Sequence, residues 1–318
     1  MMIFPKKPKP LNQHEILKRD LRLLFTEWHD HWEKDLPKKW KIADDLIILP
    51  SNCFQLTHWN EKDNFWFHLA KCFKVNRVAQ ENKVKPDDFR SPNLTLLYGN
   101  SSIVTVNNNG IKYCYDITKC MFSWGNITEK LRIASFDCSK ETVVDLYAGI
   151  GYFTLVYLVH AKAKRLIACE WNPDSVEALK NNLKINNCEH RCEILLGDNR
   201  QTCPENVADR VNLGLIPTSE QSWKTACYAL KKETGGFLHI HGNVDIHSNQ
   251  KENSTKYKKE WLEWAEYAQQ KILEILNTRT LNSNIKWTVA QDHIEYVKSY
   301  GPRVDHLVLD LKCKPNEN

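Results

Sequence analysis

The sequence predicts an α/β protein in which a doubly wound, mostly parallel sheet follows a smaller α+β domain. Two observations predict this class. After about residue 135, short apolar β-type runs alternate with helical patterns at the spacing of repeated βαβ units. Before that point, helical patterns come first and a strand–turn–strand pattern follows. We therefore expect a basic, proline-rich tail at 1–10, a small α+β domain at 11–134 and the larger α/β domain at 135–318.

The small domain is expected to contain two helices, a short strand and a hairpin. Leucines and tryptophans recur at helical spacing between Leu17 and Trp32, which predicts an amphipathic first helix. The tryptophans of this domain could stack on nucleic-acid bases, but a core position is the more usual one. The expected bounds are 11–35 and 64–75 for the helices, 45–50 for the strand, and 103–106 with 111–115 for a hairpin around Asn-Asn-Gly at 108–110.

The larger domain is expected to alternate strands and helices and to end in an antiparallel hairpin. The alternation predicts a parallel sheet with helices on both faces, the Rossmann-like arrangement. The expected strands are 142–146, 165–170, 192–196, 208–215 and 236–241, the expected helices are 152–160, 172–187 and 219–231, a further helical segment lies within 245–278, and the final hairpin pairs 285–297 with 304–311.

The composition is that of a globular protein, with 42% hydrophobic and 26% charged residues. No stretch approaches the ~20 apolar residues of a membrane span, and the first ten residues lack the apolar segment of a signal peptide. The eleven cysteines form no CxxC pair, which favours reduced thiols in the cytoplasm over disulfides or a metal site. A net charge of +5 is compatible with nucleic-acid binding without requiring it. We expect a cytoplasmic monomer without a metal ion.

A glycine turn follows the first predicted strand of the larger domain. Asp145, Gly149 and Gly151 lie between this strand and the next helix, where glycines allow a tight turn and close approach of a ligand to the backbone. Thr154 stands where a dinucleotide fingerprint would have its third glycine. A ligand without a pyrophosphate therefore fits better, and the carboxylate of S-adenosylmethionine could use the N–H groups of the loop.

Acidic and amide residues follow the next two strands. Glu170 ends the second strand, 19 residues after Gly151, where a carboxylate can accept hydrogen bonds from both ribose hydroxyls. Asp198 and Asn199 follow the third strand and could contact adenine, although Asp-Asn is also a common turn pair. Ligands of such sheets bind at the carboxyl ends of the strands. The sequence therefore predicts an S-adenosylmethionine site at this edge.

Two other features have alternative interpretations. Asn212 lies in the fourth strand, whose end faces the reacting group in this architecture, so it is the candidate for contact with the target base. His239 and His241 alternate on one strand and could resemble a metal pair. No Cys, His or Asp partner lies at ligand spacing, so packing in the core is favoured.

Longer motifs surround these residues. They are CMFSWGNITEKLR at 120–132, DLYAGIGYFT at 145–154, ACEWNP at 168–173, GDNR at 197–200, ADRVNLGLIP at 208–217, GFLHIH at 236–241 and YGPRVDHLVL at 300–309. With these motifs the chain resembles the tRNA wybutosine-synthesizing protein 2 family over about residues 35–313. The related tRNA guanine N1-methyltransferases have Asn-Leu-Pro or Asn-Pro-Pro in the fourth-strand segment, where this chain has Asn-Leu-Gly.

The resemblance implies a class I S-adenosylmethionine-dependent methyltransferase fold and a specific reaction. The 3-amino-3-carboxypropyl group of S-adenosylmethionine would move to carbon 7 of 4-demethylwyosine at position 37 of phenylalanine tRNA, releasing 5′-methylthioadenosine. The cofactor residues of the family fall on Ser123, Lys130, Glu170, Asp198 and Asn199.

We hypothesise that Lys130 pairs with the carboxylate of the methionine moiety and that Ser123 helps to hold it. No residue that activates carbon 7 is evident, and Asn212 is the nearest candidate. Two other functions stay open: a tRNA guanine-37 N1-methyltransferase, and a non-catalytic module that binds tRNA or a protein partner. Family members often carry a further N-terminal domain, and this sequence starts close to the small domain.

Overall fold

The computed structural model describes residues 12–25, 27–82, 92–122, 125–247, 257–281 and 285–317. The chain divides into two compact units. Unit 1 comprises Met1–Val106 with Cys114–Met121, and unit 2 comprises Asn107–Tyr113 with Phe122–Asn318. Residues 107–113 and 122–134, which the sequence analysis placed in the small domain, therefore belong with the larger unit.

Unit 1 packs short helices against a small sheet. Its strands have the order β1-β2-β3-β4, with β2 and β3 parallel and the other pairs antiparallel. Trp32 and Trp59 are buried in its core, which confirms the core interpretation for these two tryptophans. The elements are α1 (Gln13–Leu24), β1 (Lys41–Ala43), β2 (Leu46–Leu49), α2 (His58–Glu61), α3 (Phe65–Cys72), β3 (Arg77–Glu81) and β4 (Leu94–Tyr98).

The single helix expected over 11–35 is wrong in length. Asn12 begins α1 with a capping box, in which its side chain accepts a hydrogen bond from the backbone N–H of Glu15 and the Glu15 carboxylate accepts one from Asn12. Extended backbone at Phe25 ends the helix, and a separate 3-10 turn follows at Asp30–Asp35. Trp32 reaches the core from this turn.

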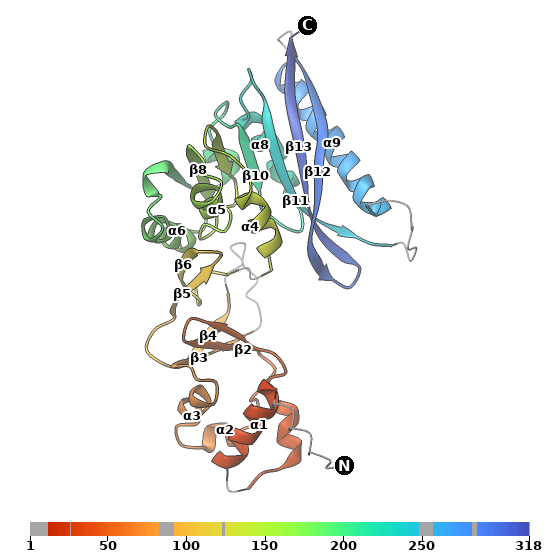
Figure 1. Ribbon diagram of the computed structural model, residues 1–318. Helices are drawn as coiled ribbons and strands as arrows, with labels where there is room; N and C mark the ends of the chain where they lie inside the picture. Colours follow the sequence, from red (N-terminus) through yellow and green to blue (C-terminus); the bar gives the residue numbers. More distant parts are fainter. Residues whose placement is uncertain are drawn as a thin grey trace, which may run out of the picture. The chain divides into compact units, whose positions relative to one another are not determined.

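Unit 2 contains the predicted doubly wound sheet (Figure 1). Its strands have the order β12-β13-β11-β10-β7-β8-β9. The five strands from β11 to β9 are parallel, and β13 is antiparallel to both β11 and β12. The prediction of an α/β fold with an antiparallel C-terminal hairpin is confirmed. The strands are β7 (Thr142–Asp145), β8 (Arg165–Glu170), β9 (Cys192–Leu196), β10 (Arg210–Leu213), β11 (Gly236–Asp245), β12 (Ile285–Gly301) and β13 (Val304–Glu317).

The helices of unit 2 follow the predicted alternation, with one addition. The helix α4 was not expected from local pattern. The helices are α4 (Ile127–Ala134), α5 (Thr154–Val159), α6 (Pro173–Ile185), α7 (Asn199–Thr202), α8 (Trp223–Ala229) and α9 (Lys259–Arg279). The predicted hairpin is present as β5 (Ile103–Asn108) and β6 (Ile111–Asp116).

The two faces of the large sheet differ in polarity. Alternate residues of a strand point to opposite faces, and one set (for example Val211 and Leu213 of β10) joins the apolar core formed with α8 and α9. The other set includes Asp145, Asn212 and His239, which are also buried. The candidate site residues Asp145 and Asn212 therefore lie on the polar face of the sheet.

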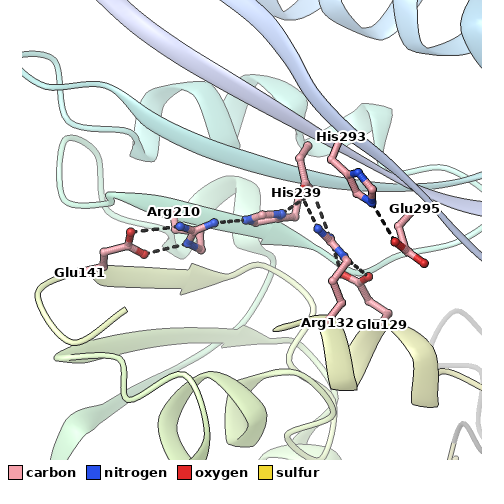
Figure 2. Close-up of polar contacts among 8 residues, drawn as sticks. Glu129, Arg132, Glu141, Arg210, His239, His293 and Glu295 are labelled. Atoms are coloured by element: carbon pink, nitrogen blue, oxygen red, sulfur yellow. Dashed lines mark hydrogen bonds and ion pairs between the residues drawn. The ribbon is translucent and has the colours of Figure 1, made fainter. Parts of the chain in front are cut away.

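A chain of buried polar contacts crosses this face and reaches α4 (Figure 2). It runs through Glu141, Arg210, His239, Asp310, Arg132 and Glu129. Arg210 can only donate, so Nε2 of His239 accepts at 2.6 Å and Nδ1–H of His239 donates to Asp310 at 2.6 Å. The core interpretation of His239 is thereby confirmed, and Arg132 ties α4 to β13 through Asp310.

Candidate S-adenosylmethionine and target-base site

The glycine turn after β7 has the backbone conformation that glycine permits. Gly149 has φ 55° and Gly151 has φ 103°. A Cβ at Gly151 would lie 3.0 Å from side-chain carbons of Leu155 and Leu179, so a larger residue would also crowd the packing of two helices. The turn therefore requires both glycines.

Asp145, the last residue of β7, supports the turn through hydrogen bonds. Its carboxylate is fully buried and accepts hydrogen bonds from Thr154 Oγ1 at 2.8 Å and from Asn212 Nδ2 at 3.0 Å. Burial raises the pKa of Asp145. Thr154, at the third position of a dinucleotide fingerprint, thus serves as a donor within the protein. Asp145 acts by holding the loop and the end of β10 together.

Glu170 lies beside the same turn. Its carboxylate accepts hydrogen bonds from the backbone N–H groups of Gly149, at 2.7 Å, and Asn172, at 2.8 Å. Burial raises the pKa of Glu170, and these backbone donors oppose that shift. The structure therefore brings together the ends of β7 and β8, as predicted, and fixes the carboxylate in position.

Asp198 and Asn199 differ in how much of each side chain is already engaged. Asp198 begins α7, and its carboxylate accepts hydrogen bonds from the backbone and guanidinium of Arg200, which lowers its pKa. Asn199 is buried, donating to the Leu146 carbonyl at 2.9 Å and accepting from Ser222 Oγ at 2.8 Å. Asn199 therefore anchors the loop after β7.

Lys130 occupies an unusual environment for a lysine. It is 2% exposed, and its ammonium lies 4.4 Å from the ring centroid of Tyr113, 5.1 Å from that of Phe122 and 5.9 Å from that of Tyr152. Its hydrogen-bond partner is Asn108 Oδ1 at 3.3 Å. Among the residues that the structure describes, no carboxylate forms an ion pair with it. Burial lowers the pKa of Lys130 to about 8.

Tyr152 connects Lys130 with the glycine turn. A Cβ built on Gly149 would lie 2.6 Å from the Tyr152 ring, so the ring covers the turn while it also faces the Lys130 ammonium. Lys130 and Glu170 thus approach the same loop from different elements. Ser123, the other residue expected to hold the methionine moiety, lies outside the described residues.

Sequence reasoning missed the aromatic residues and Asn108, because they come from a hairpin and two loops that are distant along the chain. The only local signal for Tyr152 was its position directly after Gly151. Asn212 donates to Asp145, and its Oδ1 atom is buried without a partner among the described residues. Its amide oxygen therefore has hydrogen-bonding capacity left.

The described part of the chain contains none of the features of a metal site, a disulfide framework or a membrane span. No group of three or more His, Cys, Asp or Glu side chains is arranged to hold a metal ion there. None of the eleven cysteines, all of which lie within the described ranges, forms a disulfide. No helix among the described residues has the length and apolar character needed to cross a membrane.

Comparisons with known proteins identify the family. Residues 104–273 match the TRM5/TYW2 methyltransferase domain, and residues 21–102 match the TYW2 N-terminal domain. A tRNA wybutosine-synthesizing protein 2 homolog from Danio rerio is 48% identical over 307 residues, covering 91% of this chain and 74% of the relative. The Homo sapiens homolog is 44% identical, with coverage of 91% and 72%.

Solved structures agree with these matches. Pyrococcus horikoshii TYW2 in complex with MeSAdo has a TM-score of 0.70 and 27% identity, covering 94% of this chain and 99% of that one. The complex of aTrm5 and tRNALeu has a TM-score of 0.67 at 22% identity, covering 97% and 80%, and supports the fold alone. The resemblance noted in the sequence is confirmed, and the chain belongs to the tRNA wybutosine-synthesizing protein 2 (TYW2) family.

Proposed function

We propose that this protein transfers the 3-amino-3-carboxypropyl group of S-adenosylmethionine to carbon 7 of 4-demethylwyosine at position 37 of phenylalanine tRNA, and that 5′-methylthioadenosine leaves. The observation that carries the proposal is the buried Lys130 ammonium beside the glycine turn. Relatives named tRNA wybutosine-synthesizing protein 2 at 44% to 48% identity support it, as does the TYW2 structure in complex with MeSAdo.

The residues present fit S-adenosylmethionine. Glu170 would accept hydrogen bonds from the ribose hydroxyls with a carboxylate that two backbone N–H groups already hold. Asp198 and Asn199 would line the adenine end, with Gly149 and Gly151 allowing the ligand to approach the backbone. A carboxylate is the group that a buried, uncompensated ammonium requires, so Lys130 would bind the methionine carboxylate, with Ser123 assisting.

Anchoring the carboxylate determines which carbon reacts. The sulfonium of S-adenosylmethionine has three electrophilic carbons, and the one aligned with the nucleophile is attacked. With the carboxylate held at Lys130, the γ-carbon of the methionine chain would face the base. The bond from carbon 7 to this γ-carbon forms while the bond from the γ-carbon to sulfur breaks, and its electrons neutralise the sulfonium. Carbon 7 then loses its proton.

Asn212 is the proposed contact for the target base. It lies at the carboxyl end of β10, and Asp145 fixes its amide through the Nδ2 donor. This orientation leaves Oδ1 as an acceptor for an N–H group of the base. Asn212 would thus position the base, since a neutral amide is a poor acceptor for the carbon 7 proton.

The decisive experiment uses S-adenosylmethionine with one label on its methyl group and another on its carboxyl carbon. The protein is incubated with this donor and with tRNA from cells blocked just before the transfer step, and the nucleosides are analysed by mass. Carboxyl label in the base with release of methylthioadenosine is expected. Methyl label in the base with release of S-adenosylhomocysteine would make the protein a methyltransferase, and transfer of neither label would favour a binding module.

A further inference from the structure

A second lysine that forms no ion pair with a carboxylate of the described residues lies at the carboxyl edge of the sheet. Lys298 of β12 is directly opposite His306 of β13, which in turn pairs with Asn243 near the end of β11. Because β11 runs parallel to β10, its end marks the edge where ligands of this fold bind. Lys298 is half-buried there, and burial lowers its pKa.

Gly125, just before α4, makes room for the Lys298 ammonium. A Cβ built on Gly125 would lie 2.2 Å from Lys298 Nζ, so any side chain at position 125 would displace the ammonium. No ion pair joins Lys298 to a carboxylate among the described residues. The segment that accommodates Lys298 leads directly into α4, the helix that carries Lys130.

Buried polar atoms without partners gather around the same edge. Within the described residues, they are Asn126 Oδ1, Asn212 Oδ1, His241 Nε2, Asn243 Oδ1 and His306 Nδ1. His241 Nδ1 and His306 Nε2 are 3.1 Å apart and share a hydrogen bond, so each imidazole keeps one nitrogen unused. Such atoms are rare in folded proteins. Their accumulation at the ligand-binding edge points to a polar partner that arrives with the substrate.

We infer that Lys298 binds an oxygen of the target nucleotide and thereby helps to select the tRNA substrate; this rests on the proposed function. An ammonium can only donate, so the acceptor is either the carbonyl oxygen of the guanine-derived base or an oxygen of a flanking phosphate. Gly125 is the companion specificity residue, because its missing side chain allows the ammonium to occupy this position. Lys130 would hold S-adenosylmethionine and Lys298 would hold the target nucleotide, on either side of the start of α4.

The first test compares Lys298→Met with Lys286→Met in the full chain. Lys286 lies on the same strand, is exposed, and is near the opposite end of the hairpin, so the two variants lose the same net charge. We expect Lys298→Met to weaken binding of the precursor tRNA by about tenfold, the loss of one charge-assisted hydrogen bond, with S-adenosylmethionine affinity unchanged. Lys286→Met should change tRNA affinity by less than about twofold. Equal effects of the two substitutions would overturn the inference.

The second test moves the ammonium without removing it. Gly125→Ala should weaken tRNA binding when Lys298 is present and have no effect in the Lys298→Met background. Gly301→Ala is the matched control, because a Cβ there meets nothing within 4 Å. Additive effects of Gly125→Ala and Lys298→Met would refute the assignment. If Lys298→Met fails to fold, as judged by circular dichroism, Gly125→Ala is compared with Gly301→Ala in the wild-type background. Weaker tRNA binding by Gly125→Ala alone would support the inference, and equal binding by the two variants would overturn it.

Salt dependence identifies the acceptor. Loss of a phosphate contact in Lys298→Met should reduce the slope of log affinity against log salt by about one, whereas loss of a carbonyl contact should leave it nearly unchanged. These binding measurements do not require group transfer to occur. If the wild-type protein transfers no group, the proposed function fails while the tRNA comparison still reports on Lys298.

Discussion

Replacing Lys130 by Met separates its cost to the fold from its contribution to ligand binding. Three aromatic rings and the Asn108 oxygen surround the ammonium, and its pKa falls from 10.5 to about 8. This difference corresponds to about 3 kcal/mol for keeping the charged form in the fold. Methionine has a similar length and needs no compensating charge. We therefore expect ligand-free Lys130→Met to be more stable at pH 7, by up to about 3 kcal/mol.

The pH dependence of this gain follows from the sign of the shift. Below pH 8 the lysine is charged in both the folded and the unfolded state, so the wild-type protein bears the full penalty. Between pH 8 and pH 10.5 the folded lysine loses its proton first, and the penalty disappears. The stability difference between variant and wild type should therefore be large at pH 7 and vanish above pH 10.5.

Ligand binding should change in the opposite direction. Loss of a charge-assisted hydrogen bond to the carboxylate, worth roughly 1.5–3 kcal/mol, should weaken S-adenosylmethionine binding about 10- to 100-fold. Methylthioadenosine lacks the carboxylate, so its affinity should be unchanged. Calorimetric titration of both ligands into wild type and variant measures the two effects, with Lys286→Met as the control. Unchanged S-adenosylmethionine affinity, or an equal loss for both ligands, would refute the role of Lys130.

Three further substitutions test other parts of the structure. Glu170→Gln places an amide beside backbone donors. It should weaken the binding of S-adenosylmethionine and of methylthioadenosine by about tenfold each, measured by the same titrations. Asp310→Asn removes one of the two carboxylates that pair with Arg132, the other being Glu129, and should lower the free energy of unfolding in urea by about 1.5–3 kcal/mol. Burial, partly opposed by Arg132, raises the pKa of Glu129 to about 7, so its contribution to stability is lost as the pH rises from 4.5 to 7. Glu129→Gln should make the free energy of unfolding less dependent on pH over that range. An unchanged pH dependence would contradict the raised pKa of Glu129.

Much of the larger unit could be predicted because its signals are local. The parallel strands have apolar runs between turn residues, and the Gly149 turn and Glu170 follow strand ends in the expected order. Strand lengths were less predictable. β11 continues to Asp245, beyond the expected end at 241, because ten consecutive residues pair with β13 despite a polar sequence. Pairing with a partner strand, which the local sequence does not reveal, sets these bounds.

The site around Lys130 could be predicted only in part. The resemblance pointed to Lys130, but its burial was not evident, because a lysine in a short helix is usually solvated. The groups that bury it come from Asn108, Tyr113 and Tyr152, which lie up to 44 residues apart along the chain, and from Phe122. Periodicity within one segment cannot report contacts of this kind.

The buried polar chain also limits how this sequence can diverge. Removing the single ionic partner of a buried charge leaves that charge unpaired, and such a change is strongly destabilising. Loss of Arg132 would leave two buried carboxylates, Glu129 and Asp310, without their guanidinium, and loss of Glu141 would leave the buried Arg210 without a carboxylate. Descendants of one ancestor should therefore differ at all members of such a group or at none. We therefore expect these positions to change together, although they lie far apart in the gene.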